Sequence, residues 1–398
     1  MEMEHFVPLT KAELVNELES ELPTEIQPRF RQFANLLSST IHNDFHKNLE
    51  DLKESYRPFD PDPDVPIRNP VKDPDDTQFM KRLDYLLKKA NFKKLGEKEL
   101  NHALTTHSLY SRSVDVNLSE LDEWALYHRG LSRRIHKIKS WKTLFRQRRL
   151  EVESYDRLVL AIRFTPGFIA SSEERRNALD SDHIYIKYFR NVPLNDLEMV
   201  FPNTSYHMSI WDKIKVAVPT LGAAVLAAGR VLPVILAVAG GVAGASMGGL
   251  EMAAVGGALG ALIGIAFRAY INYKNARITY MQALTEGLYF KILDSNAGVF
   301  HRLLDAAEEE EVKEALLAQH FLRAAPLSES ELDGAVEGWF KKKKIPFDFE
   351  VDDGLAKLYR LGLAREDKGK WSVIDLKDAI IHLDEKWDAL FNPTTDLK

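Results

Sequence analysis

The sequence contains no cysteine among its 398 residues. This absence excludes disulfide bonds, thiolate metal sites, cysteine nucleophiles and lipid attachment to cysteine. The N-terminal stretch MEMEHFVPLTKAELVNELESEL also lacks the basic start and apolar centre of a secretory signal, and the arginine-rich, acid-poor character of an organelle presequence. We therefore expect a protein of bacterial type, without a removable targeting segment.

Signatures of several catalytic classes are lacking too. The chain has no phosphate-binding loop, no kinase motif set and no CxxC pair. The formal net charge of -6 is mild and gives no support for nucleic acid as the main partner. The sequence implies no cofactor, and an enzyme would need a catalytic site whose residues are dispersed along the chain.

Charge is nearly absent from residues 216–267, where only Arg230 and Glu251 are charged. This run is too long for one membrane-spanning helix of about 20 residues and suits two helices with a short turn. The sequence therefore predicts a transmembrane hairpin, approximately Ile214–Leu236 and Met247–Phe267. The alternative is a helical hairpin buried inside a large protein core.

Basic residues flank this hairpin on both sides, whereas its turn contains none. Because basic residues favour the cytoplasmic side, both chain termini are expected there. The bacterial plasma membrane is the expected location, with an organelle inner membrane as the alternative. The flanking residues that could contact lipid head groups are Lys213, Lys215, Arg268, Lys274 and Arg277.

Glycines recur every four residues within the same region. A spacing of four places residues on one helix face, where glycines let a second helix approach closely. The pattern favours a helix-packing seam over a loop or a phosphate-binding turn. The residues of this seam are Gly240, Gly244, Gly248, Gly256, Gly260 and Gly264.

Arg230 and Glu251 are expensive within a bilayer, at about 2.5–3.5 kcal/mol each near the centre of a helix. Three arrangements are open. The two side chains could pair across the hairpin, both could lie near the outer interface, or both could line a polar path in an oligomer.

Outside the hairpin, the periodicity predicts several folded parts. The fold class is an α+β membrane protein with the predicted segments 1–55 (N-terminal helices), 56–77 (a linker rich in proline and aspartate), 78–210 (a mixed α+β cytoplasmic domain), 211–270 (the hairpin) and 271–398 (a helical, winged-helix-like domain). The basic stretch 133–150 lies between two strand patterns. It is either a solvated ribbon or a surface that faces anionic lipid.

The C-terminal part reads as three helices followed by a small hairpin. Ser328 and Glu331 have the spacing of a capping box. The acidic run 308–311 and the lysine run 341–344 are interpreted as solvated helix faces or helix ends. The third helix begins with acidic residues, which disfavours DNA binding and favours a protein contact.

His42 and His46 have an i, i+4 spacing that suits a shared metal ion, but no HExxH motif or third ligand accompanies them. We therefore predict no metal site. The two histidines are interpreted as part of a solvated helix face.

The segments DLEMVFPNT, LYFKILDSNAGV and DFEVDDGLAKLYRLGL carry a family resemblance. The chain from about residue 110 to 375 resembles proteins similar to transmembrane protein 143, a family with a conserved domain of unknown function. The resemblance implies two membrane spans in bacteria or organelles. It implies no agreed activity and no catalytic residues.

Three functions are consistent with the sequence. The first is a membrane-anchored interaction or regulatory protein that faces the cytoplasm and forms a homo-oligomer through the glycine-rich hairpin. Its α+β and winged-helix-like parts would bind a protein partner or each other. The second is a gated pore or membrane-perturbing effector. The third is a membrane-bound enzyme with a dispersed site in the α+β domain.

Overall fold

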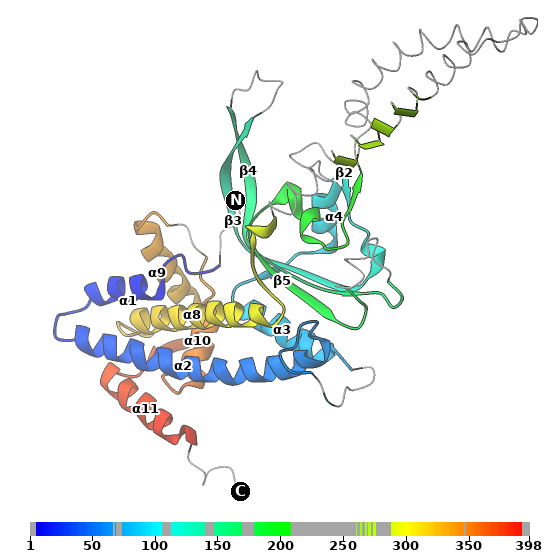
Figure 1. Cartoon of the computed structure of the whole chain (residues 1–398). Coiled ribbons are helices and arrows are strands. Elements are labelled where there is room, and N and C mark those ends of the chain that lie inside the picture. The colour runs from blue at the N-terminus through cyan, green and yellow to red at the C-terminus, as the bar shows by residue number, and fades with distance from the viewer. Residues whose placement is uncertain are drawn as a thin grey trace, which may run out of the picture. The chain divides into compact units, whose positions relative to one another are not determined.

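The computed structural model describes residues 5–391 apart from residues 67, 69–73, 106–112, 140–146, 169–178, 208–259, 261–262, 265–266, 269, 272–273, 276–287 and 346–347. The chain divides into two units, whose elements are labelled in Figure 1. Unit 1 comprises Met1–Glu97, Ser119–Pro193 and Leu293–Lys398, and unit 2 comprises Lys98–Leu118 and Leu194–Ile292.

Long amphipathic helices make up much of unit 1. Its described α-helices are α1 (Lys11–Ser20), α2 (Gln27–Tyr56), α3 (Thr77–Lys89), α8 (Ala297–Leu322), α9 (Glu329–Lys342), α10 (Val351–Arg360) and α11 (Leu376–Asp388). Thr10 and Ser328 each close a capping box at the start of α1 and α9. The capping box predicted for Ser328 and Glu331 is therefore confirmed.

Helix α8 is the central helix of this unit. Every residue from Glu310 to Gln319 is buried, because α1, α2, α3, α9 and α10 all pack against it. In Figure 1 α8 runs beside α2 in the helical part of the unit. Tyr56, Phe79 and Phe300 form an aromatic contact among α2, α3 and α8, with ring centroids 5.0–5.9 Å apart.

A sheet packs against these helices. Its strand order is β1-β3-β4-β5-β7, with bounds Lys93–Lys94, Leu121–Lys139, Gln147–Phe164, Ile184–Pro193 and Ile292–Ser295. The β1–β3, β3–β4 and β4–β5 pairs are antiparallel. Tyr127, Val159 and Ile186 belong to the same apolar core as the helices. The Tyr56 hydroxyl donates a hydrogen bond of 2.7 Å to the Ile184 carbonyl, which ties α2 to β5.

Strands β3 and β4 continue beyond the rest of the sheet as a two-stranded ribbon (Figure 1). The ribbon leaves the sheet next to Gly130, Asp156 and Asn191, which lie opposite one another on β3, β4 and β5. The regular pairing of the strands is interrupted at these three residues. Gly130 and Asn191 both have left-handed backbones, at φ 74° and 53°. A Cβ on residue 130 would lie 2.8 Å from Asp156 Oδ2, so only glycine fits there.

The C-terminal part has the predicted order of helix, helix, helix and hairpin. After α8, α9 and α10, strands β8 (Ala364–Asp367) and β9 (Lys370–Val373) form the hairpin. Leu327 and Trp371 exchange backbone hydrogen bonds of 3.1 and 2.7 Å, which dock the hairpin next to the start of α9. Helix α10 buries Leu355, Lys357 and Leu358 against α8.

Unit 2 contains shorter described elements. Helix α4 (Glu97–Thr105) begins at the unit boundary, strands β2 (Ser113–Asp115) and β6 (Ser205–His207) pair antiparallel, and η4 (Leu194–Val200) is a 3-10 segment. The residues described between Gly260 and Asn275 are helical and exposed. The other 3-10 segments among the described residues are η1 (Arg57–Phe59), η2 (Leu118–Glu120) and η5 (Ala389–Phe391).

The predicted fold class of an α+β membrane protein requires correction. Among the described residues, no helix combines the length and the apolar character needed to cross a membrane. What is observed is a mixed α+β architecture with a five-stranded sheet. The two spans predicted at Ile214–Leu236 and Met247–Phe267 lie largely in residues 208–259, outside the described residues.

The predicted multi-pass location, with both termini cytoplasmic, depended on those spans and is corrected with them. The prediction equated a scarcity of charge with a lipid-facing helix. Nearly half of residues 216–267 are alanine or glycine, whose small side chains contribute little apolar surface per residue.

Candidate binding sites

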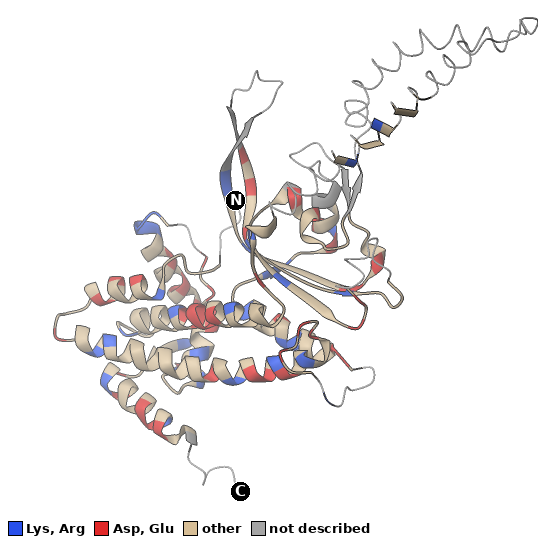
Figure 2. Ribbon diagram, viewed as in Figure 1, with Lys and Arg blue, Asp and Glu red and all other residues tan. Residues whose placement is uncertain are grey.

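Four charged side chains of α8 and one of α10 are buried together in unit 1. We call them the buried charge cluster, and each of its members is 2–3% exposed: Glu310, Glu311, Lys313, Glu314 and Lys357. Figure 2 shows red and blue adjacent on the middle of α8. Such burial is costly unless each charge is paired and hydrogen-bonded.

The chain's N-terminal segment satisfies the first pair. Lys313 Nζ lies 2.5 Å from Glu310 Oε1 and donates to the backbone carbonyls of Val7 and Leu9 at 3.0 and 3.1 Å. The Val7 N–H in turn donates to Glu310 Oε2 at 2.9 Å. Because these are bonds to backbone groups, they fix the path of residues 7–9 along α8.

Helices α3 and α10 supply the cations for Glu311. Its carboxylate forms an ion pair with Lys357 of α10, and Lys89 Nζ of α3 lies at 3.5 Å. Lys89 also pairs with Asp353 at 2.9 Å. Burial lowers the pKa of Lys357, and the neighbouring Glu311 charge opposes that shift. Glu311 of α8 therefore links α3, through Lys89, and α10, through Lys357, at one point.

Glu314 has no cation within ion-pair distance among the described residues. The Asn91 side chain donates to its Oε1 at 3.2 Å and to the His5 carbonyl at the same distance. Burial, followed by the charges of Glu310 and Asp353, raises the pKa of Glu314 well above its ordinary value. This upward shift of the pKa favours the uncharged form of the carboxyl group, which needs no compensating cation.

Gly354 lets α10 approach the backbone of α8 at this place. A Cβ on residue 354 would lie 2.8 Å from the Glu314 carbonyl oxygen and 3.5 Å from the Ala318 side chain. The α8 backbone therefore leaves no room for a larger residue. The same approach brings Lys357, one helical turn later, to Glu311.

The buried charge cluster is a structural clamp and not a catalytic site. Side chains 2–3% exposed cannot meet a substrate, and their charged atoms already bind one another and the backbone. The interpretation of the acidic run 308–311 as a solvated face is therefore wrong for Glu310 and Glu311. The lysine run is confirmed as an exposed helix end at Lys341, Lys342 and Lys344.

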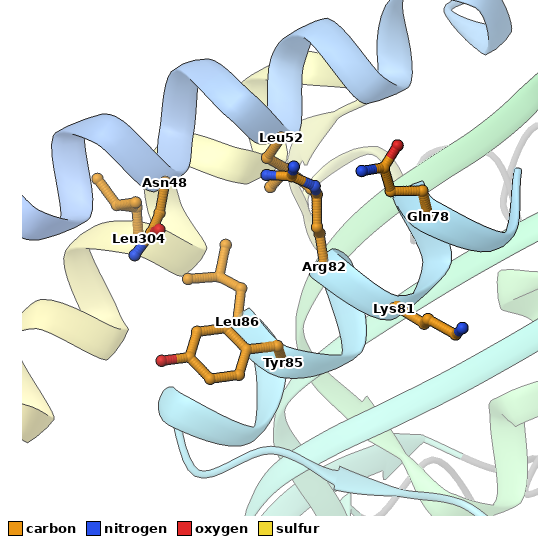
Figure 3. Close-up of a pocket in the computed structure, with 8 residues that line it drawn as sticks. All are labelled: Asn48, Leu52, Gln78, Lys81, Arg82, Tyr85, Leu86 and Leu304. Atoms are coloured by element: carbon orange, nitrogen blue, oxygen red, sulfur yellow. The ribbon is translucent and has the colours of Figure 1, made fainter. Parts of the chain in front are cut away.

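A pocket lies elsewhere in unit 1, among α2, α3 and α8. Its volume is about 210 Å³ and it opens at the surface (Figure 3). Its lining residues are Asn48, Leu52, Gln78, Lys81, Arg82, Tyr85, Leu86 and Leu304. The sequence did not predict this pocket, because α8 lies more than 200 positions after α2 and α3 in the chain.

The base of the β3–β4 ribbon carries compensated charge. Arg133 Nε lies 3.1 Å from Glu153, and Arg134 lies 2.8 Å from Asp156. Asp156 also accepts a hydrogen bond of 2.7 Å from Ser132. The stretch 133–150 does not simply lie between two strands but extends them, because β3 and β4 stay in register as far as Lys139 and Gln147. Its solvated and lipid-facing interpretations stay predictions.

Unit 2 holds a buried titratable group in the segment DLEMVFPNT. Glu198 is 4% exposed, and burial, with a smaller contribution from the Asp196 charge, raises its pKa to about 7. Burial also lowers the pKa of Lys291 in the same unit. A carboxyl group with this pKa can exchange a proton near neutral pH.

Most of the predicted hairpin sites lie outside the described residues. These are Gly240, Gly244, Gly248 and Gly256 of the seam, the charges Arg230 and Glu251, and the flanking Lys213, Lys215 and Arg277. Gly260 and Gly264 are helical and exposed, and a Cβ on either meets no described atom within 4 Å. Arg268 and Lys274 are also helical and exposed. The packing seam remains a prediction.

The histidine pair of α2 is not brought together with further ligands. His42 Nδ1 lies 2.8 Å from Glu308 Oε2 on α8. No group of three or more residues suited to hold a metal ion occurs in the described part of the chain. His42 instead forms a polar contact between α2 and α8 at the surface.

The comparisons with known proteins concern the middle of the chain. Residues 155–298 match a family model described as Protein of unknown function (DUF3754). No solved structure matches the chain. The match includes DLEMVFPNT and nearly all of LYFKILDSNAGV, whereas DFEVDDGLAKLYRLGL and the buried charge cluster lie outside it.

The comparisons therefore support the predicted resemblance only in part: they find a domain of unknown function, but not the transmembrane protein 143 family. No finding links the chain to that family by name. Residues 155–298, from β4 to the start of α8, form a DUF3754 domain of unknown function.

Proposed function

We propose that this protein is an interaction protein whose β3–β4 ribbon binds an extended acidic segment of a partner protein as an added strand. One observation carries the proposal: the ribbon continues past every described strand that could cover its edges. Backbone hydrogen bonds from such an edge supply affinity in strand addition, and side chains supply specificity.

The register defines how far the edges extend. The β4–β5 pairing ends at Ser154 and Pro193, and proline has no N–H with which to continue a ladder. The outer edge of β3 pairs with β1 only at Tyr127 and His128. From these points to Lys139 and Gln147, no other described strand pairs with β3 or β4.

The sequence of the ribbon favours an acidic partner. Residues 133–150 include Arg133, Arg134, Lys137, Lys139, Lys142, Arg146, Arg148 and Arg149, and contain no aspartate or glutamate. Basic residues on an edge strand discourage pairing with a second copy of the same edge. An extended segment rich in carboxylates would be attracted instead.

Anionic lipid head groups are the other occupant considered from the sequence. They would match the charge of the ribbon but could not complete a backbone ladder. An acidic strand can do both, which is why the proposal commits to a protein segment. Duplex nucleic acid would likewise match the charge of the ribbon but could not complete a backbone ladder.

The experiment uses two fluorescent ten-residue peptides of equal charge. In one, glutamate alternates with valine. In the other, the same residues carry N-methyl groups on their backbone amides, so that the backbone donors needed for strand addition are missing. Fluorescence anisotropy with the full chain should show that the first peptide binds at least about tenfold more tightly.

Two matched variants locate the binding. The double substitution Lys137→Glu and Arg149→Glu should weaken peptide binding about tenfold, because it reverses charge on paired positions of the ribbon. Lys341→Glu with Lys342→Glu reverses charge on another basic run and should leave the affinity unchanged. Equal binding of both peptides, or binding only to anionic vesicles or duplex DNA, would contradict the proposal.

A further inference from the structure

The pocket among α2, α3 and α8 is the feature that neither the buried charge cluster nor the ribbon explains. We propose that it binds a small amphipathic carboxylate, whose apolar group is one ring or a short branched chain. This inference is independent of the ribbon and holds whether or not the ribbon binds a partner.

The inner part of the pocket is apolar. Leu52, Leu86 and Leu304 come from three different helices, and all three belong to the apolar core of unit 1. In Figure 3 their side chains converge on the space between the helices. An apolar group that entered this space would remove leucine surface from water, which is favourable in proportion to the area covered.

The polar residues of the pocket are arranged on one face of α3. Gln78, Lys81, Arg82 and Tyr85 follow the i, i+3, i+4, i+7 spacing that places side chains on the same side of a helix. Tyr85 is 46% exposed although its ring is large and apolar. The rim therefore offers a ring surface beside two cations.

The charge at the rim favours an anionic ligand. Arg82 forms an ion pair of 3.0 Å with Asp51, whose side chain is 63% exposed. Such an exposed pair contributes little and can rearrange toward a second carboxylate. Lys81 is exposed and makes no ion pair among the described residues, and its side chain is directed away from the space between the helices in Figure 3. A ligand carboxylate at the rim would therefore meet Arg82 first, and Lys81 would reach it by a rotation of its flexible side chain.

The size of the pocket limits the class of ligand. Drug-sized ligands and cofactors occupy pockets of about 300–1,000 Å³, whereas a cavity of about 150 Å³ holds benzene. A volume of about 210 Å³ lies between these cases. It admits a ring with a short chain and excludes a nucleotide. A space of about 210 Å³ encloses one small group, so the proposal commits to a free acid and not to a long peptide.

The experiment uses 3-phenylpropionate as the probe and 3-phenylpropanol as its neutral match. Saturation-transfer NMR and calorimetry with the full chain should detect the acid with a Kd of about 1 mM or lower. The alcohol should bind at least about fivefold more weakly. The substitutions Lys81→Gln and Arg82→Gln should each reduce this preference for the acid.

Asn48→Trp tests the position of the ligand. Asn48 is exposed at the rim, so tryptophan there would occlude the pocket without disturbing the core. Lys47→Trp, at the exposed neighbouring position outside the pocket, is the control. The acid should bind the Lys47 variant normally and the Asn48 variant at least about tenfold more weakly.

Three results would overturn the inference. One is the absence of binding at 10 mM probe to a folded chain. Another is equal binding to the two tryptophan variants. The third is binding of an apolar acidic peptide but not of the free acid, which would assign the pocket to a protein segment. None of these results depends on the peptides or variants that test the ribbon.

Discussion

The acidic run on α8 and the basic β3–β4 ribbon each concentrate charge of one sign, and their surroundings differ. Glu310 and Glu311 are buried and meet cations and backbone donors from distant parts of the chain. At the base of the ribbon, Arg133 and Arg134 pair with carboxylates of β4. Residues 133–150 themselves contain no aspartate or glutamate to compensate their basic side chains. A charge run is thus stabilised internally only where the fold delivers complementary groups to it.

The largest expected effect breaks the buried side of this comparison. Lys357→Met should lower the free energy of unfolding by about 3 kcal/mol or more, because Glu311 stays buried without its nearest cation. Arg133→Met removes an exposed ion pair at the base of the ribbon and should cost at most about 1 kcal/mol. Urea denaturation of both variants measures the difference.

A double variant is the control for Lys357. Replacing Glu311 by leucine together with Lys357→Met removes both charges and should recover most of the lost stability. Equal losses in the Lys357 and Arg133 variants would show that burial does not distinguish the two ion pairs.

A second, smaller effect concerns the close approach of α10 to α8. Gly354→Ala should cost about 2 kcal/mol, because the new Cβ must push the α10 backbone away from the Glu314 carbonyl. Gly338→Ala lies inside α9, where a Cβ meets no described atom within 4 Å. It should stabilise the protein by about 0.5–1 kcal/mol, through helix propensity alone. Thermal unfolding of the two alanine variants would show shifts of opposite sign.

The third prediction sharpens the comparison by asking whether Glu314 is protonated in the folded protein. Its pKa in the folded protein lies above the ordinary value of 4.5, so the folded state binds this proton more tightly than the unfolded chain. Stability from this group is therefore present at low pH and is lost as pH rises from about 4.5 through the folded pKa. Each unit of pKa shift corresponds to about 1.4 kcal/mol.

Glu314→Gln keeps an acceptor for Asn91 and removes the titration. The variant should therefore gain stability relative to the parent as pH rises from 5 to 8. Parallel pH profiles of unfolding for the two proteins would mean that Glu314 is ionised in the folded state.

Local sequence signals predicted local structure well in this chain. Leu14 and Leu18, four positions apart, are both buried on α1. Ser328 and Glu331 form the predicted capping box, and the strand patterns on either side of residues 133–150 form parts of β3 and β4. In each case the atoms that interact belong to neighbouring residues or to a regular repeat, so the sequence contains the necessary information.

The candidate sites could not be predicted in the same way. The carboxylate of Glu310 meets Val7, which is 303 positions away, and Glu311 meets Lys89 and Lys357. Only the arrangement of the helices brings these groups together. One signal was available: apolar residues such as Val312, Leu316 and Leu317 surround α8 on all sides, which leaves no solvated face for the charges between them.

The membrane prediction failed for a related reason. It used the absence of charge between residues 216 and 267 as its main observation. Among the described residues no helix is long and apolar enough to cross a membrane, and the helical residues described between Gly260 and Asn275 are exposed. The predicted contacts of the glycine seam depend on a helix pairing that the spacing alone cannot specify.

The bond between Val7 and Glu310 also has a consequence for the order of events during synthesis. The two residues are separated by 303 positions, so a ribosome adding about 5–20 residues per second needs roughly 15–60 s to supply the second one. Until then α1 and α2 have no α8 to cover, and their apolar faces remain available to chaperones. The N-terminal helices are thus the first part of unit 1 to be made and among the last to reach their final contacts.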